Sequence, residues 1–242
     1  LSWALQPNTA ALAGIADLRG YDLPVSKDTE RLQMALNPQP IRPWFRIDEL
    51  PSLSLLRFAS VRAVVSTKPL ESEIDLGKAP LFAQPIKNSM PRAWLATGAR
   101  QVDTPEQSIR WIQQDPEAPS RPPVELGAQN LGLDGTIHAV DNLRITSRSV
   151  SFRVDAPKAG IAVINDAWHP GWTVRVNGQE TTSLRVGGVF RGVLVEPGLN
   201  HVQWVFHPRS WTWGWILFGV GALLLIGFEI RVRRLGATMH SG

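Results

Sequence analysis

The chain has 242 residues, 43% of them hydrophobic, which is enough for the core of one or two domains. Its 25 Lys and Arg residues against 21 Asp and Glu residues give a net charge of +4. The basic residues are scattered apart from a cluster at Arg231, Arg233 and Arg234, so the sequence does not indicate a nucleic-acid-binding face. The absence of Cys excludes disulfides, cysteine-based zinc sites and thiol nucleophiles.

The first third of the chain is typical of mixed helix and strand. Capping residues predict one helix from Asn8 through residue 18 and a second that follows Ser26 and stops before Asn37. Four prolines mark residues 38–51 as a loop or linker. A brief helix and three strands are expected next, at residues 52–60, 61–67, 80–86 and 93–102.

A clearer helix signal follows at Thr104-Pro105-Glu106-Gln107, which combines a capping residue, Pro at the first helical position and Gln at the third. This helix carries Ile109 and Ile112 on one face and is expected to end at Asp115-Pro116. The proline-rich residues 115–123 then read as a connector. We place a domain boundary there, between a mixed α/β portion at residues 1–123 and a second portion at 124–210.

Residues 124–210 are predicted to form an antiparallel β-sandwich, because short strands recur with turns every 8–12 residues. Alternating residues are expected to face the core: Phe152, Val154, Ala156, Trp172, Val174, Val176, Val202, Trp204 and Phe206. Asn177-Gly178 indicates a two-residue hairpin, since both positions accept positive φ. Residues 180–186 would be the returning strand.

Residues 211–230 are predicted to be a transmembrane helix, because residues 211–228 contain no charge and the length approaches the ~20 residues that span a bilayer. Trp211, Trp213 and Trp215 lie at one end, where an aromatic belt is expected, and the three arginines follow the other. The positive-inside rule puts residues 1–210 outside the cytoplasm and the tail at 231–242 inside it. The alternative is a buried core helix of a soluble protein.

The predicted orientation requires a signal that directs about 210 residues across the membrane. Residues 1–20 lack the basic and long apolar regions of a signal peptide. We therefore expect this chain to be a piece of a longer protein with an earlier membrane helix or signal.

Motifs that would carry chemistry are weak in this chain, and we predict no catalytic residue, cofactor or metal site. Asp166 and His169 could suggest a metal or acid–base site, but Pro170-Gly171 favours a turn in which Asp bonds the backbone. His201 and His207 share a strand face but are about 20 Å apart, too far for one metal. We find no phosphate-binding glycine loop or nucleophile motif.

The order of several short motifs resembles the C-terminal extracytoplasmic module of the YfhO-type bacterial membrane proteins. The resemblance covers residues 17–234 and ends in a membrane helix. Asn177 departs from the more usual Asp of the family hairpin, and both residues suit the turn. The motifs that carry the resemblance are Leu18-Arg-Gly-Tyr-Asp22, Met90-Pro-Arg-Ala-Trp94, Pro170-Gly171-Trp172, Asn177-Gly178, Phe190-Arg191-Gly192-Val193, Pro197-Gly198 and His201.

The resemblance implies a polytopic, GT-C-like glycosyltransferase of the bacterial cytoplasmic membrane that uses a polyprenyl-phosphate-linked sugar and acts on cell-envelope glycans. The key carboxylate of such enzymes lies in an early extracytoplasmic loop, which no motif of this chain matches. The chain would then be an accessory region whose partners are the lipid bilayer and, through the parent protein, the lipid-linked sugar and the glycan. A non-enzymatic, membrane-tethered module that binds glycan or protein is the alternative.

Four residues are candidate glycan contacts: Arg92, Trp94, Trp168 and Arg191. Exposed aromatic rings can stack on sugars, but Trp168 and Trp172 can equally fill the edge of the sandwich. Arg191 can equally form a structural ion pair with Asp166 or Glu196.

Overall fold

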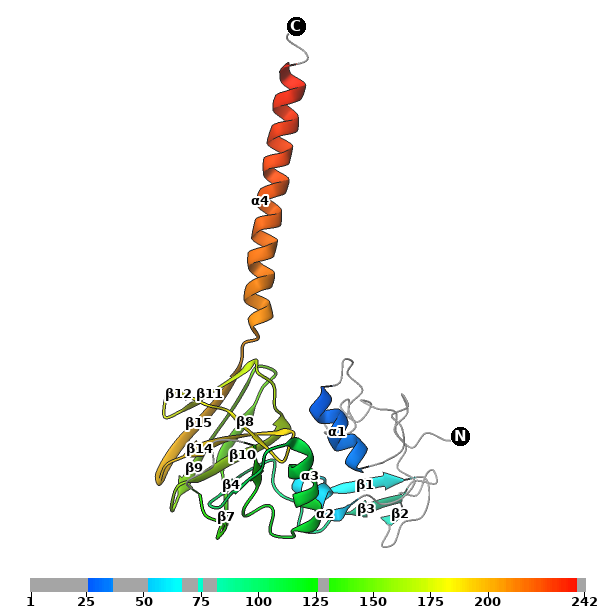
Figure 1. Cartoon of the computed structure of the whole chain (residues 1–242), viewed down its shortest axis with the longest axis vertical. Helices are drawn as coiled ribbons and strands as arrows, with labels where there is room; N and C mark the ends of the chain where they lie inside the picture. Colours follow the sequence, from blue (N-terminus) through cyan, green and yellow to red (C-terminus); the bar gives the residue numbers. More distant parts are fainter. Residues whose placement is uncertain (1–25, 37–51, 67–73, 76–81, 126–130, 239–242) are drawn as a thin grey trace.

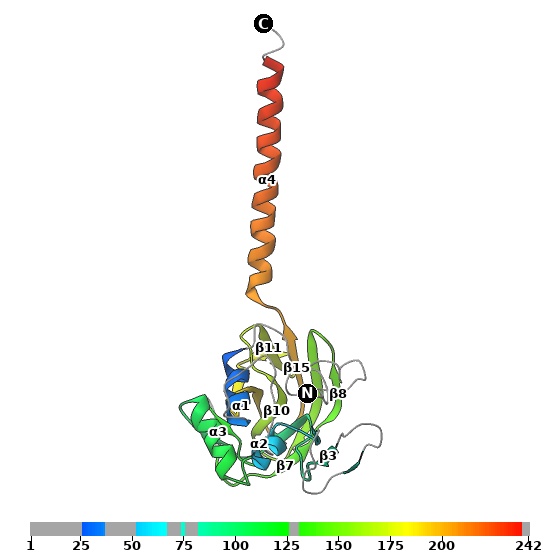
Figure 2. The same ribbon diagram turned by 90° about the vertical axis from the view of Figure 1, so that its right-hand side faces the viewer.

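The computed structural model describes residues 26–36, 52–66, 74–75, 82–125 and 131–238. The helix expected at residues 8–18 and the loop expected at 38–51 lie outside these ranges. The described residues form a head and one long helix, α4 (Arg209–Thr238), which extends away from it (Figures 1 and 2).

The head has three layers: a helical layer, a seven-stranded sheet and a five-stranded sheet (Figure 1). The seven-stranded sheet has the order β5 (Arg100–Gln101), β6 (Pro123–Val124), β13 (Leu184–Val186), β14 (Phe190–Val195), β10 (Gly160–Ala167), β4 (Ala93–Ala96), β7 (Ile137–Ala139). The five-stranded sheet has the order β12 (Gln179–Thr181), β11 (Trp172–Val176), β15 (Gly198–Phe206), β9 (Ser149–Ala156), β8 (Asp141–Ile145).

The central strands of the seven-stranded sheet, β4, β10 and β14, are buried on both faces. In β4, Trp94 and Ala96 face the core shared with the helices, whereas Ala93 and Leu95 face the core shared with the five-stranded sheet. This double burial explains why β4 and most of β10 are apolar at consecutive positions rather than at every second one. The five-stranded sheet has one solvent-facing side, so β9, β11 and β15 alternate as the sequence predicts, whereas the edge strands β8 and β12 are exposed throughout.

Three helices cover the outer face of the seven-stranded sheet: α1 (Lys27–Leu36), α2 (Leu53–Phe58) and α3 (Pro105–Gln114). The predicted caps are confirmed at α1 and α3. The Ser26 hydroxyl accepts a hydrogen bond from the Thr29 amide at 3.1 Å, and the Thr104 hydroxyl accepts one from the Gln107 amide at 3.2 Å. Ile109 and Ile112 are buried as expected.

A separate small antiparallel sheet, in the order β1 (Ala63–Ser66), β3 (Phe82–Pro85), β2 (Ile74–Asp75), extends the head beside α2. It contains the strands expected at 61–67 and 80–86.

The Asn177-Gly178 hairpin is confirmed, with φ of 53° and 83° at its two positions. The single returning strand expected at 180–186 is wrong. The chain pairs as β12 in the five-stranded sheet and then crosses to the seven-stranded sheet as β13. Ser183 marks the crossing, and its hydroxyl lies 3.3 Å from the indole nitrogen of Trp204.

The boundary expected at residue 123 does not separate two bodies. Strands β4 and β5 precede it, yet both belong to the same sheet as β10, β13 and β14. The described parts of residues 1–123 and 124–210 therefore form one α+β head.

The helix expected at residues 211–230 lies within α4, which is longer and includes most of the residues expected to form a tail. Within the described part of the chain, no helix meets the combination of length and apolar character needed to traverse a bilayer.

The backbone at Gly135 lies against the backbone of Ser120 and of Gly98, and only glycine fits there. A Cβ at this position would lie 2.0 Å from the Ser120 carbonyl oxygen and 2.5 Å from the Gly98 nitrogen. We expect Gly135→Ala to lower the free energy of unfolding by about 1–3 kcal/mol, because backbone atoms must move apart. Gly132→Ala is the matched control, since its Cβ would meet only one atom, at 4.0 Å. Urea unfolding monitored by Trp fluorescence checks this, and equal effects of the two substitutions would contradict it.

Candidate functional site

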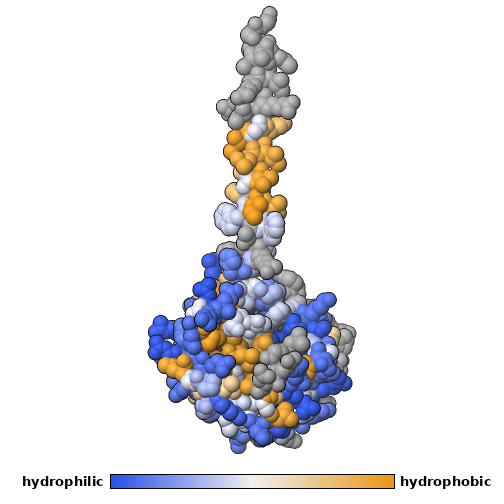
Figure 3. Space-filling model, turned by 60° about the vertical axis from the view of Figure 1, so that its left-hand side comes forward, coloured by the Kyte–Doolittle hydropathy of each residue, from blue (hydrophilic) through white to orange (hydrophobic). Residues whose placement is uncertain are grey.

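The most unusual surface of the molecule is the apolar part of α4. The large apolar side chains between residues 213 and 228 are 48–71% exposed, and Figure 3 shows them as a band that stands clear of the head. Four consecutive residues, 223–226, cover every side of the helix, because each residue advances the direction by about 100°. Those exposed side chains are Trp213, Trp215, Ile216, Leu217, Phe218, Val220, Leu223, Leu224, Leu225, Ile226 and Phe228.

The junction between β15 and α4, residues 206–208, packs against the head and is called the root of α4 below. Only His207 and Pro208 separate β15 from α4, and the His207 amide donates a hydrogen bond of 2.7 Å to the Gly171 carbonyl. The Phe206 ring packs 5.1 Å from the ring of Trp172. A Cβ at Gly171 would lie 2.9 Å from the Phe206 ring, so glycine permits this close contact.

Arg191 is the largest buried charge below this root. Its side chain is 1% exposed, its Nη2 donates to the Asp166 carboxylate at 2.8 Å, and its guanidinium lies 3.9 Å from the ring centre of Trp172. Burial lowers the pKa of Arg191 to about 10, while the charge of Asp166 opposes that shift. The side chain is therefore charged at neutral pH and needs Asp166.

Asp166 is shared by two arginines. Its Oδ1 accepts hydrogen bonds from Arg92, whose side chain is 41% exposed, while its Oδ2 accepts from Arg191. Within the described residues, Nε and Nη1 of Arg191 have no hydrogen-bond partner. The carboxylate of Asp166 and the ring of Trp172 therefore stabilise the buried charge of Arg191. This cluster of Arg92, Asp166, Arg191 and Trp172 connects the end of β10 to the start of β11.

The predicted glycan contacts do not form one surface. Trp94 is 0% exposed, and its indole donates to the Pro119 carbonyl at 3.3 Å, so it is a core residue. Arg191 is also inside the head and forms the ion pair with Asp166 that was the alternative interpretation. Arg92 and Trp168 remain partly exposed. The Trp168 indole donates to the Ser183 carbonyl at 3.4 Å, and the Arg185 guanidinium covers its ring at 4.4 Å.

The Asp166 and His169 pair has a structural role. The predicted backbone contact of Asp166 is replaced by its two arginines, whereas His169 Nδ1 accepts a hydrogen bond from the Gly171 amide at 2.9 Å. His201 and His207 are exposed. Among the described residues, no group of three or more His, Asp or Glu side chains could hold a metal ion.

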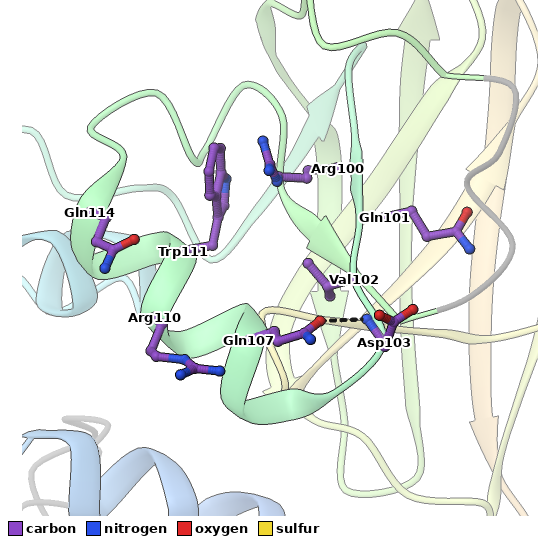
Figure 4. A pocket seen from close by; sticks show the side chains of 8 residues that line it. All are labelled: Arg100, Gln101, Val102, Asp103, Gln107, Arg110, Trp111 and Gln114. Carbon is purple, nitrogen blue, oxygen red and sulfur yellow. Dashed lines mark hydrogen bonds between the residues drawn. The ribbon is translucent and has the colours of Figure 1, made fainter.

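The head has two hollows that no sequence motif signals. One, of about 350 Å³, lies between β5 and α3 and is drawn in Figure 4. The other, of about 440 Å³, lies beside Arg121 and Lys158. The first combines Trp111 with Arg100, which stacks on its ring at 3.5 Å. Nothing in the spacing of these two residues along the chain signals that pairing.

Comparison of the chain with protein-family models, with curated proteins and with solved structures found no match in any of the three.

The dependence of Arg191 on Asp166 can be measured. We expect Asp166→Asn to lower the free energy of unfolding by about 3–5 kcal/mol, because it leaves a buried charge without its partner. Arg92→Gln breaks the exposed half of the same cluster and should cost less than about 1 kcal/mol. Urea unfolding of the two variants compares these costs. The double substitution Asp166→Asn with Arg191→Met should recover part of the loss, and equal costs for the two single variants would refute the assignment.

Lowering the pH should reduce the free energy of unfolding of the head partly through protonation of Asp115. Hydrogen bonds from Arg121, and one from the Glu117 amide, hold the pKa of Asp115 below its ordinary value. As the pH falls, the unfolded chain therefore binds this proton before the folded chain does, and stability is lost progressively below about pH 5. Asp115→Asn and Arg121→Gln should both flatten the dependence of the urea midpoint on pH between about 5 and 2.5. A wild-type slope in either variant would argue against this pair.

Proposed function

We propose that α4 crosses a lipid bilayer and that the head lies on its extracytoplasmic side. The observation that carries the proposal is the band of exposed apolar side chains that surrounds α4. Residues 211–228 contain no charge, and as a helix they cover about 27 Å, close to the thickness of the hydrocarbon core. Water solvates such a surface poorly, whereas lipid tails match it.

The flanking residues support an orientation. Trp211, Trp213 and Trp215 adjoin the head, and Arg231, Arg233 and Arg234 follow the apolar segment. Aromatic residues favour the interface and arginines favour the cytoplasmic side. In the proposed arrangement, residues 1–210 are outside the bacterial cytoplasmic membrane and the C-terminus is inside.

The parent protein, in this proposal, is a polytopic GT-C-like glycosyltransferase of the YfhO type that acts on cell-envelope glycans with a lipid-phosphate sugar donor. The support is the ordered set of motifs from Leu18 to His201, together with the two-residue link into α4. The head would then be an accessory region held near the membrane-embedded site, with the catalytic carboxylate supplied elsewhere in the parent protein.

A non-enzymatic tethered module is the second candidate. It is favoured by the two hydrophobic cores that the described residues of the head form on either side of the seven-stranded sheet. The number of membrane helices in the parent protein separates the two candidates: ten or more favour the transferase, and a lone signal sequence favours the tethered module.

These 242 residues contain no Cys, so single cysteines introduced into them can report the topology by labelling. Single cysteines are introduced as Ser147→Cys, in the exposed turn between β8 and β9, and Ser241→Cys, near the C-terminus. In intact cells that express the parent protein, a membrane-impermeant maleimide should label the first variant. It should label the second only after permeabilisation, because the bilayer separates the two positions.

The parent protein without either introduced cysteine controls for background labelling. Labelling of both variants in intact cells, or release of the protein from membranes by alkaline carbonate, would refute the membrane-crossing role of α4.

A further inference from the structure

The hollow between β5 and α3, called the groove below, is open to solvent and lined mainly by polar side chains. Its volume is about 350 Å³. Gln107, Arg110, Trp111 and Gln114 follow the spacing i, i+3, i+4, i+7, so α3 presents them on one side. The remaining lining residues come from β5 and the segment after it, as Figure 4 shows: Arg100, Gln101, Val102 and Asp103.

Two arginines in this groove are available to a ligand. Within the described residues, neither Arg100 nor Arg110 forms an ion pair or a side-chain hydrogen bond. Arg100 is nevertheless held in place, since its guanidinium stacks on the Trp111 ring at 3.5 Å. A guanidinium stacked through its flat face keeps its N–H edge free, and that edge matches the geometry of carboxylate and phosphate groups.

The other lining groups favour a hydroxyl-rich ligand. Three glutamines contribute amides, each of which can both donate and accept. Gln107 Oε1 accepts a hydrogen bond of 2.8 Å from the Asp103 amide, which fixes that side chain and leaves its NH2 group for a ligand. Two arginines against one aspartate give the lining a net positive charge. Val102 and the partly covered Trp111 offer little apolar area, so an apolar ligand does not fit.

We propose that this groove binds a saccharide segment that bears an acidic group, phosphate or carboxylate. Arg100 and Arg110 would bind the acidic group, and the glutamines would pair with hydroxyls. In both views α3 lies in the half of the head away from α4 (Figures 1 and 2). The binding chemistry stands on the groove alone, whereas the identification of the ligand as an envelope glycan rests on the proposed function.

Calorimetric titration of the full chain in detergent micelles tests the proposal. The probes are poly(glycerol phosphate), polygalacturonate and neutral dextran, which separate the phosphate source from the carboxylate source and both from an uncharged polysaccharide. We expect one or both acidic polymers to bind in a salt-dependent manner and dextran to bind at least tenfold more weakly. The double variant Arg100→Gln with Arg110→Gln should weaken acidic-polymer binding by about tenfold or more, because charge-assisted hydrogen bonds are lost.

The matched control removes two positive charges elsewhere, as Arg144→Gln with Arg175→Gln on the exposed face of the five-stranded sheet. It should change the affinity less than about twofold, since these residues lie outside the groove. If the double variant of the groove fails to fold, the single variant Arg110→Gln replaces it in the titration, because Arg110 is exposed and its substitution should not disturb the core.

If the two double variants weaken acidic-polymer binding equally, binding depends on the net charge of the protein rather than on the groove. That outcome would refute the proposal. Absence of acidic-polymer binding, or equal binding of dextran, would also overturn it. These outcomes are separable from the topology test. If acidic polymers do not bind but the cysteines are labelled as expected, only the ligand-binding role of the groove is rejected. If the polymers bind but both cysteines are labelled in intact cells, the membrane-crossing role of α4 is rejected and the ligand-binding role of the groove stands.

Discussion

The guanidinium of Arg191, buried and paired with Asp166 of the same sheet, joins the two sheets by stacking on Trp172, at the end of the head from which α4 leaves. Arg191 belongs to β14 of the seven-stranded sheet, yet its guanidinium lies on Trp172 of β11 in the five-stranded sheet. Trp172 in turn packs on Phe206, the last residue before the link to α4. One carboxylate thereby supports a chain of contacts from the central sheet to the root of the helix.

This arrangement places a polar cluster beside the apolar core between the two sheets. A purely apolar contact would tolerate sliding of one sheet over the other, whereas a hydrogen-bonded guanidinium permits fewer positions. A firm root is useful if α4 is an anchor, because the two-residue link then transmits the orientation of the helix to the head. The groove at α3 would be held in a defined direction relative to the bilayer.

The two surfaces proposed to interact with other molecules are physically unlike and lie apart. The exposed part of α4 is apolar on every side and suits lipid. The groove at α3 is lined by guanidinium and amide groups around one stacked indole and suits a charged, hydroxylated ligand. In the proposed arrangement, the head would remain attached to a membrane through α4 while the groove stays free to bind a ligand from the aqueous side.

The amino-acid sequence determined the features that depend on neighbouring residues along the chain. Ser26 and Thr104 predicted the starts of α1 and α3, Asn177-Gly178 predicted a hairpin, and alternation in β9 and β15 predicted their buried faces, because capping, turn geometry and one-sided burial are local. Tertiary structure decided the rest. The seven-stranded sheet recruits β4 from before the expected boundary, and its double burial removes the alternation by which a strand is recognised. Trp94 and Arg191 became interior residues, and Arg100 met Trp111, through contacts between distant parts of the chain. A sequence pattern reports which side of an element is apolar, but only the packing of elements decides which side chains face one another.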